Sequence, residues 1–452
     1  MLDFNIGYNG SENFAPGKRY GTFPSFSAGW TVSNESFFRD NVDNSKFNFL
    51  KLRASWGKLG NNSIDNYAFL STYAANNYVI GNTLTNGLAV SAYANPLLRW
   101  ETTTSADLGL DIAVLNNRLT ATVDAYIRKT ENILLNETVP RVSGANSLTR
   151  NVGGMENKGI EITLGWKDDI GDFSYSIDGN VSFVKNTVTN LGTSGVLQST
   201  FGYDNALIDF SGQFSNIIRS YPGNPYGQFY GYNFLGIFQN QSEIDNYKSS
   251  DGKVIQPDAK PGDSKFADIN GDGKIAAKDD MVLIGDPNPV AIFGLNFNAS
   301  WRNFDLSMLF QGTAGNDIYN ASKFYFEKFD GRQNVLARAY KAGWNGEGST
   351  NSVPIYLADA AGGSARNNLN WSSSTLYIED GSYFRLKNIQ LGYTFNPNFN
   401  AVKMGFRVYV SAQNLFTITK YSGFDPELSG IGVDRGQYPQ PRTFVLGLNI
   451  NL

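Results

Sequence analysis

One short stretch of the chain carries side chains that could bind a metal ion. Residues 268–279 read DINGDGKIAAKD and match the D-x-[DN]-x-[DN]-G pattern of a calcium-binding loop. Ca²⁺ takes about six or more oxygen ligands. The candidate ligands are three side chains, one backbone carbonyl and one terminal carboxylate: Asp268, Asn270, Asp272, the carbonyl of Lys274, and Asp279. The pattern predicts a bound Ca²⁺ that stiffens the surrounding insertion, 263–286, and takes no part in catalysis.

A second interpretation of this loop stays open. Its last ligand position holds Asp279, which is shorter than the usual Glu and closes less readily around an ion. Lys274 and Lys278 also reduce the local negative charge. The same residues suit a solvated turn rich in Asp, Asn and Gly.

The composition excludes several other kinds of site. The chain has 452 residues and contains neither Cys nor His. It therefore lacks a Ser–His triad, acid–base catalysis by histidine and most zinc sites. A net charge of −4 without a long basic run argues against a nucleic-acid partner. No motif sets two carboxylates opposite a substrate, so we expect no enzymatic activity.

The loop lies in a chain whose main pattern is strict alternation of apolar and polar residues. Between residues 104 and 128 every second residue is apolar, and the phase changes at Asn116-Asn117. Such alternation predicts strands with one apolar and one polar face, joined here by a tight hairpin turn. Each strand runs roughly ten residues, the length that crosses a bilayer when tilted, whereas soluble strands average about five or six.

The same pattern predicts twelve strands. They are residues 2–8, 22–32, 47–57, 104–115, 118–128, 159–167, 173–184, 291–301, 304–311, 383–395, 404–412 and 443–452. A change of phase between Leu386 and Ile389 predicts a β-bulge. Short connections (115–118, 167–172, 302–303, 396–403 and the longer 33–46) alternate with long ones (58–102, 129–158, 185–290, 312–382, 413–442). This alternation is typical of an outer-membrane β-barrel, with short periplasmic turns, long extracellular loops and a periplasmic C-terminus.

Two further sets of residues have a predicted place in such a barrel. Charged residues on the polar faces are expected to meet water inside the barrel: Arg53, Asp107, Asp111, Asp124, Glu161 and Asp178. Aromatic residues of the long connections are expected to pack the loops together, or else to stack on sugar rings or peptide side chains: Tyr73, Tyr78, Tyr93, Phe201, Tyr203, Tyr226, Tyr319 and Trp371.

Several segments together carry a family resemblance. They are GKRYGTFPSFSAGW (17–30), LKLRASWGKLGN (50–61), NPLLRWETTTSADLGLD (95–111), NVGGMENKGIEITL (151–164), FYGYNFLGIF (229–238), GNDIYN (315–320), YIEDGSYFRLKNIQLGYTF (377–395) and YVSAQNLFTITKYSGFDPE (409–427). They resemble the SusC/RagA-type TonB-dependent transporters of Bacteroidota. The resemblance covers nearly the whole chain. It implies that residues 1–452 are the C-terminal part of a barrel of about 22 strands, without the signal peptide, TonB box and plug that lie upstream in the family. One departure is the last residue, Leu452, where such barrels often end on an aromatic.

The resemblance also implies a function and partners. The whole protein would import oligosaccharides or peptides across the outer membrane. A SusD-like lipoprotein would cap the extracellular loops, and the TonB–ExbB–ExbD complex would supply energy through the missing plug. The alternative is a secreted carbohydrate-binding β protein with a dockerin-like calcium loop at 268–279. That alternative predicts a protein soluble without detergent, although a single loop lacks the paired repeat that dockerins use.

Overall fold

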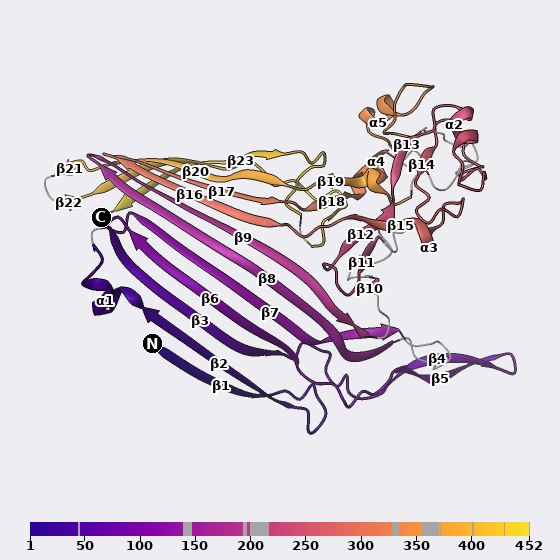
Figure 1. The fold of residues 1–452 in the computed structure, drawn as a ribbon, viewed down its shortest axis with the longest axis horizontal. Coiled ribbons are helices and arrows are strands. Elements are labelled where there is room, and N and C mark those ends of the chain that lie inside the picture. Colours follow the sequence, from indigo (N-terminus) through magenta and orange to yellow (C-terminus); the bar gives the residue numbers. More distant parts are fainter. Residues whose placement is uncertain are drawn as a thin grey trace.

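A single large sheet dominates the computed structural model (Figure 1). The structure describes residues 1–43, 46–138, 147–192, 197–198, 217–327, 334–354, 370, 372–399, 402–428 and 430–451. The sheet forms a curved wall, and the long connections extend from one end of it. The short turns and the C-terminus lie at the opposite end (Figure 1).

Twelve antiparallel strands build the wall, in the order β1-β2-β3-β6-β7-β8-β9-β16-β17-β20-β23-β25. Their bounds are β1 Leu2–Gly10, β2 Tyr20–Thr31, β3 Phe47–Asn61, β6 Glu101–Val114, β7 Leu119–Thr138, β8 Ser147–Ile170, β9 Phe173–Leu191, β16 Ala291–Trp301, β17 Phe304–Ala314, β20 Tyr383–Phe395, β23 Gly405–Thr419 and β25 Thr443–Asn451. All twelve predicted strands are confirmed. Strands β7, β8 and β9 run well beyond their predicted ends, because their backbone ladder continues through polar pairs such as Lys129 opposite Glu156.

Two of the short connections are tight turns with left-handed backbone. Leu115, Asn116 and Asn117 link β6 to β7 with φ angles of 56°, 55° and 60°. Arg302, with φ of 52°, lies in the turn between β16 and β17. Asn adopts this conformation more easily than most residues, so the Asn pair suits the first turn.

The register gathers the apolar residues of all strands on one face of the wall. Leu110, Val123 and Ile162 lie directly opposite one another on β6, β7 and β8. This apolar face is bare: Leu108 is 67% exposed, and Leu446 of β25 is 76% exposed. An exposed apolar face of this extent fits contact with lipid. The alternate residues make up the polar face.

The predicted bulge is also present. Lys387 is skipped in the pairing of β20 with both of its neighbours, since Leu386 and Asn388 face consecutive residues of β17. An extra residue changes the face to which the side chains that follow it point. Arg385 and Lys387, two residues apart, lie on the same side of the strand and contact the same partner, described below.

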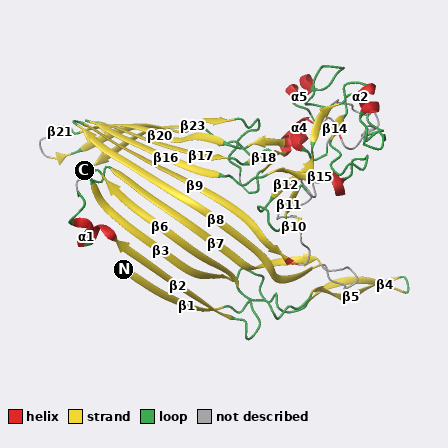
Figure 2. Cartoon of the chain, viewed as in Figure 1, coloured by secondary structure: helices red, strands yellow, loops and turns green. Residues whose placement is uncertain are grey.

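Smaller elements lie in the connections, and most of them, like most helices, are in the long ones (Figure 2). Three small sheets are two-stranded: β4 Thr72–Ile80 with β5 Thr83–Ala92, β13 Phe234–Ile237 with β14 Ser264–Phe266, and β21 Asn398–Phe399 with β22 Val402–Lys403. A four-stranded sheet contains β10 Leu197–Gln198, β11 Ile218–Ser220, β12 Gln228–Tyr232 and β15 Met281–Gly285. A three-stranded sheet places β18 Asp317–Asn320 between β19 Ile378–Asp380 and β24 Val433–Asp434. The helices are η1 Val32–Asn34, α1 Ser36–Arg39, α2 Gln241–Asn246, α3 Ala277–Asp280, α4 Ala321–Glu327, α5 Ala337–Ala342 and η5 Thr375–Tyr377. In the described ranges no helix has both the length and the apolar character needed to span a membrane.

Charge substitutions should distinguish the two faces. Val123→Arg places a guanidinium on the apolar face, where a charge in mid-bilayer costs roughly 2–4 kcal/mol. Thr122→Arg is the matched control, because Thr122 donates a hydrogen bond to Asp111 on the polar face at 3.2 Å. The free energy of unfolding of the full-length protein in lipid should fall for the first variant and change much less for the second. Equal losses would show that the faces are misassigned.

Candidate functional site: the polar face and the loop body

The polar face of the wall carries ion pairs that bridge adjacent strands and strands two apart. Arg53 of β3 contacts Asp111 of β6 and Asp124 of β7, in each case with a nitrogen–oxygen distance of 2.8 Å. The register places Glu161 opposite Asp124. The six charged residues predicted for the barrel interior therefore share the polar face: Arg53, Asp107, Asp111, Asp124, Glu161 and Asp178. One guanidinium here holds two carboxylates in place. The three side chains form a fixed charged surface rather than an acid–base pair.

Glycines make room for these bridges. Gly109 lies between Arg53 and Asp124 in the register, and a Cβ atom there would collide with both side chains. Gly392 of β20 plays the same part between Asp305 of β17 and Arg407 of β23, which pair over its backbone. A strand without a side chain at that point lets the charges on its two neighbours meet.

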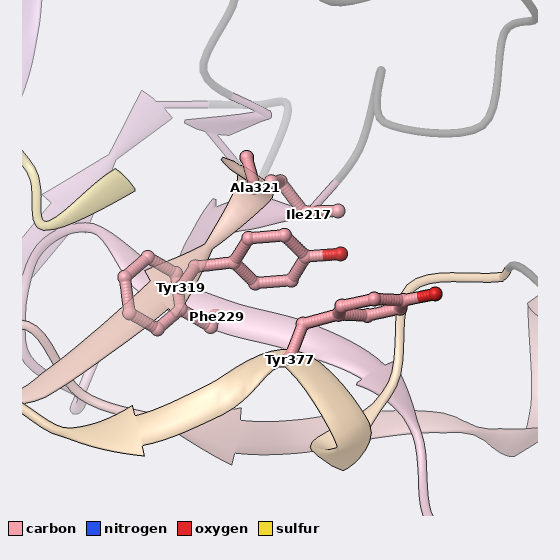
Figure 3. Packing of buried hydrophobic residues seen from close by; sticks show 5 residues of the cluster. All are labelled: Ile217, Phe229, Tyr319, Ala321 and Tyr377. Carbon is pink, nitrogen blue, oxygen red and sulfur yellow. The ribbon is translucent and has the colours of Figure 1, made fainter. Parts of the chain in front are cut away.

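The long connections form a second unit, the loop body, made of residues 217–290, 315–327, 372–382 and 420–438. Its core cluster contains Ile217, Phe229, Tyr319, Ala321 and Tyr377 (Figure 3). The Tyr319 ring packs 5.9 Å from Phe229 and 5.8 Å from Tyr377, between ring centroids. Figure 3 shows the two tyrosine hydroxyls pointing in the same direction. The cluster joins two connections that lie far apart in the sequence, and Val433 of a third packs against it.

The loop aromatics divide between packing and exposure. Tyr319 is fully buried, so the packing interpretation is confirmed for it. Tyr226 is half-buried, and burial raises its pKa to about 12. Tyr73 and Tyr78 of the β4–β5 hairpin are 66% and 48% exposed. Tyr93 is also exposed, and Phe201, Tyr203 and Trp371 lie outside the described residues.

A buried ion-pair network holds the loop body to the wall. Arg385 of β20 contacts Asp425 at 2.5 Å and Glu427 at 2.6 Å, and Lys387 contacts Glu427 at 2.9 Å. The side chains of Arg385 and Asp425 are only 3% and 4% exposed. Burial alone would raise the pKa of Asp425, but the Arg385 guanidinium and two backbone amides hold it below its usual value. Sequence reasoning missed this network, although 377–395 and 409–427 are two of the segments that carry the family resemblance.

The candidate calcium loop forms a compact turn. Asp268 accepts hydrogen bonds from the amides of Gly271 and Gly273, each at 2.8 Å. Asn270 and Asp272 accept from the amides of Asp272 and Lys274. The turn thus gathers two carboxylates and one amide oxygen, a donor set that suits a hard cation.

The carboxylate that accepts hydrogen bonds from the backbone beside this turn is Asp280, next to the predicted ligand Asp279. Asp279 is exposed on α3, whereas Asp280 is fully buried and accepts hydrogen bonds from the amides of Ile269 and Ala276. Across the described ranges, no group of three or more Asp, Glu, His or Cys side chains is gathered as a metal site. The Ca²⁺ ion with its ligands Asp268, Asn270, Asp272, Lys274 and Asp279 therefore stays a prediction.

Known proteins share this architecture. Residues 2–262 match the family described as TonB dependent receptor-like, beta-barrel. The chain is 34% identical to TonB-dependent receptor P3 of Formosa agariphila, a match that covers 100% of this chain and 44% of that protein. It is 29% identical to TonB-dependent receptor SusC of Bacteroides thetaiotaomicron, over 100% of this chain and 42% of that protein. The solved RagAB peptide transporter superposes with a TM-score of 0.77 and 26% identity, over 99% of this chain and 45% of that one. The chain thus spans less than half the length of these relatives.

Acid should release the segment 420–440 from the wall. The pKa of Asp425 is lower in the folded state than its ordinary value of about 3.9. The ionised Asp425 side chain therefore stabilises the folded state fully above its ordinary pKa. This contribution is lost as the pH falls through the lower pKa of the folded state. Asp425→Asn should release the segment at neutral pH as well, because breaking a buried pair costs about 3–5 kcal/mol. Amide hydrogen exchange at Glu427 and Gln440 reports both effects.

A matched control for this prediction is Lys420→Gln in the same segment. The Lys420 side chain is 87% exposed and lies 3.9 Å from Asp380. Exposed pairs contribute at most about 1 kcal/mol, so exchange should stay near the parent's rate. Unchanged exchange in Asp425→Asn would contradict the anchoring role of the network.

Calcium should protect the insertion 263–286 from trypsin. If the predicted ion binds, chelation should expose Lys265, Lys274 and Lys278 to cleavage, and Asp268→Ala with Asp272→Ala should be cleaved in either condition. Asp280→Asn is the informative control, because it opens the turn without removing a predicted ligand. Equal resistance of the parent with and without calcium would leave the solvated turn as the correct interpretation.

Proposed function

The chain belongs to the TonB dependent receptor-like β-barrel family, in its SusC/RagA group, and from this we propose that it is the C-terminal part of an outer-membrane importer of oligosaccharides or peptides. The observation that carries the proposal is agreement over the whole chain, wall and loop body together, with a peptide transporter. The secreted carbohydrate-binding alternative does not explain twelve long strands with a bare apolar face.

The two faces of the wall suggest how this chain would serve import. The apolar face would meet lipid, and the bridged charges of the polar face would line a water-filled interior. Ion pairs such as Arg53 with Asp111 would hold some of these charges in fixed positions along the path of a polar substrate.

The loop body would form the rim where substrate and cap meet. Its aromatic core and the Arg385 anchor give the rim a fixed shape. A SusD-like lipoprotein would close against it from outside. The TonB–ExbB–ExbD complex would act from the periplasm, through a plug contributed by the rest of the protein. A Ca²⁺ ion at 268–279 would serve only to stiffen the insertion 263–286.

The orientation follows from the lengths of the connections. Long loops are extracellular and short turns periplasmic in bacterial outer-membrane barrels. The short turns lie at the same end of the wall as the C-terminus (Figure 1). We therefore place the C-terminus in the periplasm.

Cysteine labelling of the full-length protein on intact cells tests this orientation. The chain has no cysteine of its own. Glu347→Cys, an exposed position of a long connection, should react with a membrane-impermeant maleimide. Asn303→Cys in a short turn should react only after the outer membrane is opened. The reverse pattern would contradict the proposed polarity.

Uptake measurements test the import itself. Cells that carry the full-length protein should accumulate a fluorescent oligosaccharide or a fluorescent peptide, and a deletion strain should not. Collapse of the proton gradient should stop accumulation, because energy would come through TonB. Continued uptake after collapse would indicate a passive pore instead.

A further inference from the structure

The apolar face of the wall ends in lysines toward the long connections. Lys58 of β3, Lys129 of β7, Lys158 of β8 and Lys185 of β9 lie on this face by register. Each is the next residue of the face beyond a large apolar one: Trp56, Ile127, Ile160 and Phe183. On four strands, β3, β7, β8 and β9, the side chains of this face therefore change from apolar to cationic at nearly the same height.

The positive charge of this border exceeds its negative charge. Glu156 lies 3.3 Å from Lys129 and 2.7 Å from Lys158, and Glu131 is the other carboxylate on the same face. Four ammonium groups thus meet two carboxylates. Within the described ranges, Lys58 and Lys185 form no ion pair. Lys158 extends toward the long connections to reach Glu156, as a lysine does when it lifts its charge out of hydrocarbon.

A groove in the apolar face leads up to these lysines. Its floor is formed by small residues on adjacent strands, Ala54, Ala106 and Ala125, and larger side chains such as Leu108 and Phe183 line it. Its volume of about 810 Å³ falls within the roughly 300–1,000 Å³ of small-ligand sites. Lys158 and Lys185, directly opposite each other in the register, also line it.

We propose that this groove binds an acyl chain of a phosphate-bearing, multiply acylated lipid of the outer leaflet, with the phosphate held by Lys158 and Lys185. The assignment to the outer leaflet rests on the proposed orientation. Lysine is a compact point charge that binds phosphate well, and the groove gives an acyl chain more packing contacts than a flat wall does. A purely apolar protein partner would leave the ammonium group of Lys185 uncompensated, since in the described part of the chain only Lys158 of the two has a carboxylate partner, Glu156. The net positive charge at the head of the groove therefore favours an anionic lipid.

The test uses the full-length protein in phosphatidylcholine nanodiscs, with native mass spectrometry to count retained lipid. The probes are lipid A, dephosphorylated lipid A and phosphatidylglycerol, each added separately. Lipid A should be retained most strongly. Lys158→Gln with Lys185→Gln should weaken its binding roughly 30-fold, from the usual contribution of a lysine near an anionic lipid surface. Ala125→Phe fills the groove floor with an apolar side chain. It should weaken the binding of lipid A and of dephosphorylated lipid A alike.

The control is Lys167→Gln, which removes a lysine from the polar face near a short turn and should change nothing. Heat-modifiable gel mobility confirms that each variant is folded. Equal retention of lipid A and its dephosphorylated form would overturn the phosphate site, and equal retention of phosphatidylglycerol would overturn the assignment to a multiply acylated lipid. If a second copy of the protein occupied the groove in place of lipid, the groove would be an oligomer interface and the lipid site would be overturned. Lipid binding in nanodiscs does not depend on import or orientation, so a failure of the proposed function would show separately, in labelling or uptake.

Discussion

The requirement that every backbone polar group find a partner away from water governs this structure. In hydrocarbon an unpaired amide or carbonyl costs several kcal/mol, so a chain that crosses repeatedly must pair each crossing with the next. The twelve strands satisfy this requirement with an unbroken antiparallel ladder in which neighbours in the sheet follow one another along the chain. The irregular backbone is confined to the ends of the strands, where water or the loop body supplies partners.

The ladder also fixes how the two faces are used. Because side chains alternate along each strand, one choice of register sends all the apolar residues to one side and the charges to the other. Charges on adjacent strands would crowd one another if every position carried a side chain. Gly109 and Gly392 remove that crowding, so that Arg53 and Arg407 each reach a carboxylate two strands away. Each guanidinium thus finds its carboxylate partners within two strands of its own.

The loop body follows a different principle. It has an interior of its own, with fully buried aromatic rings such as Tyr319 and Phe229. The bulge at Lys387 is the point where the two parts meet. Beside it, Arg385 and Lys387 of one strand hold Glu427 with two cations, and this contact fixes the loop body to the wall.

The sequence by itself determined the wall. Period-two alternation identified all twelve strands, the faces of Arg53 and Val123, and the bulge near Lys387, because these features depend on nearest neighbours along and across strands. It did not determine contacts made between distant segments. Arg385 meets Asp425 forty residues further along the chain, Asp280 is buried and accepts hydrogen bonds from the amides of Ile269 and Ala276, and Tyr319 packs against the rings of Phe229 and Tyr377. The ends of β7, β8 and β9 were also missed, since the apolar pattern stops at the membrane border while hydrogen bonding continues beyond it. Each of these depends on which surfaces pack together, and only the tertiary structure decides that.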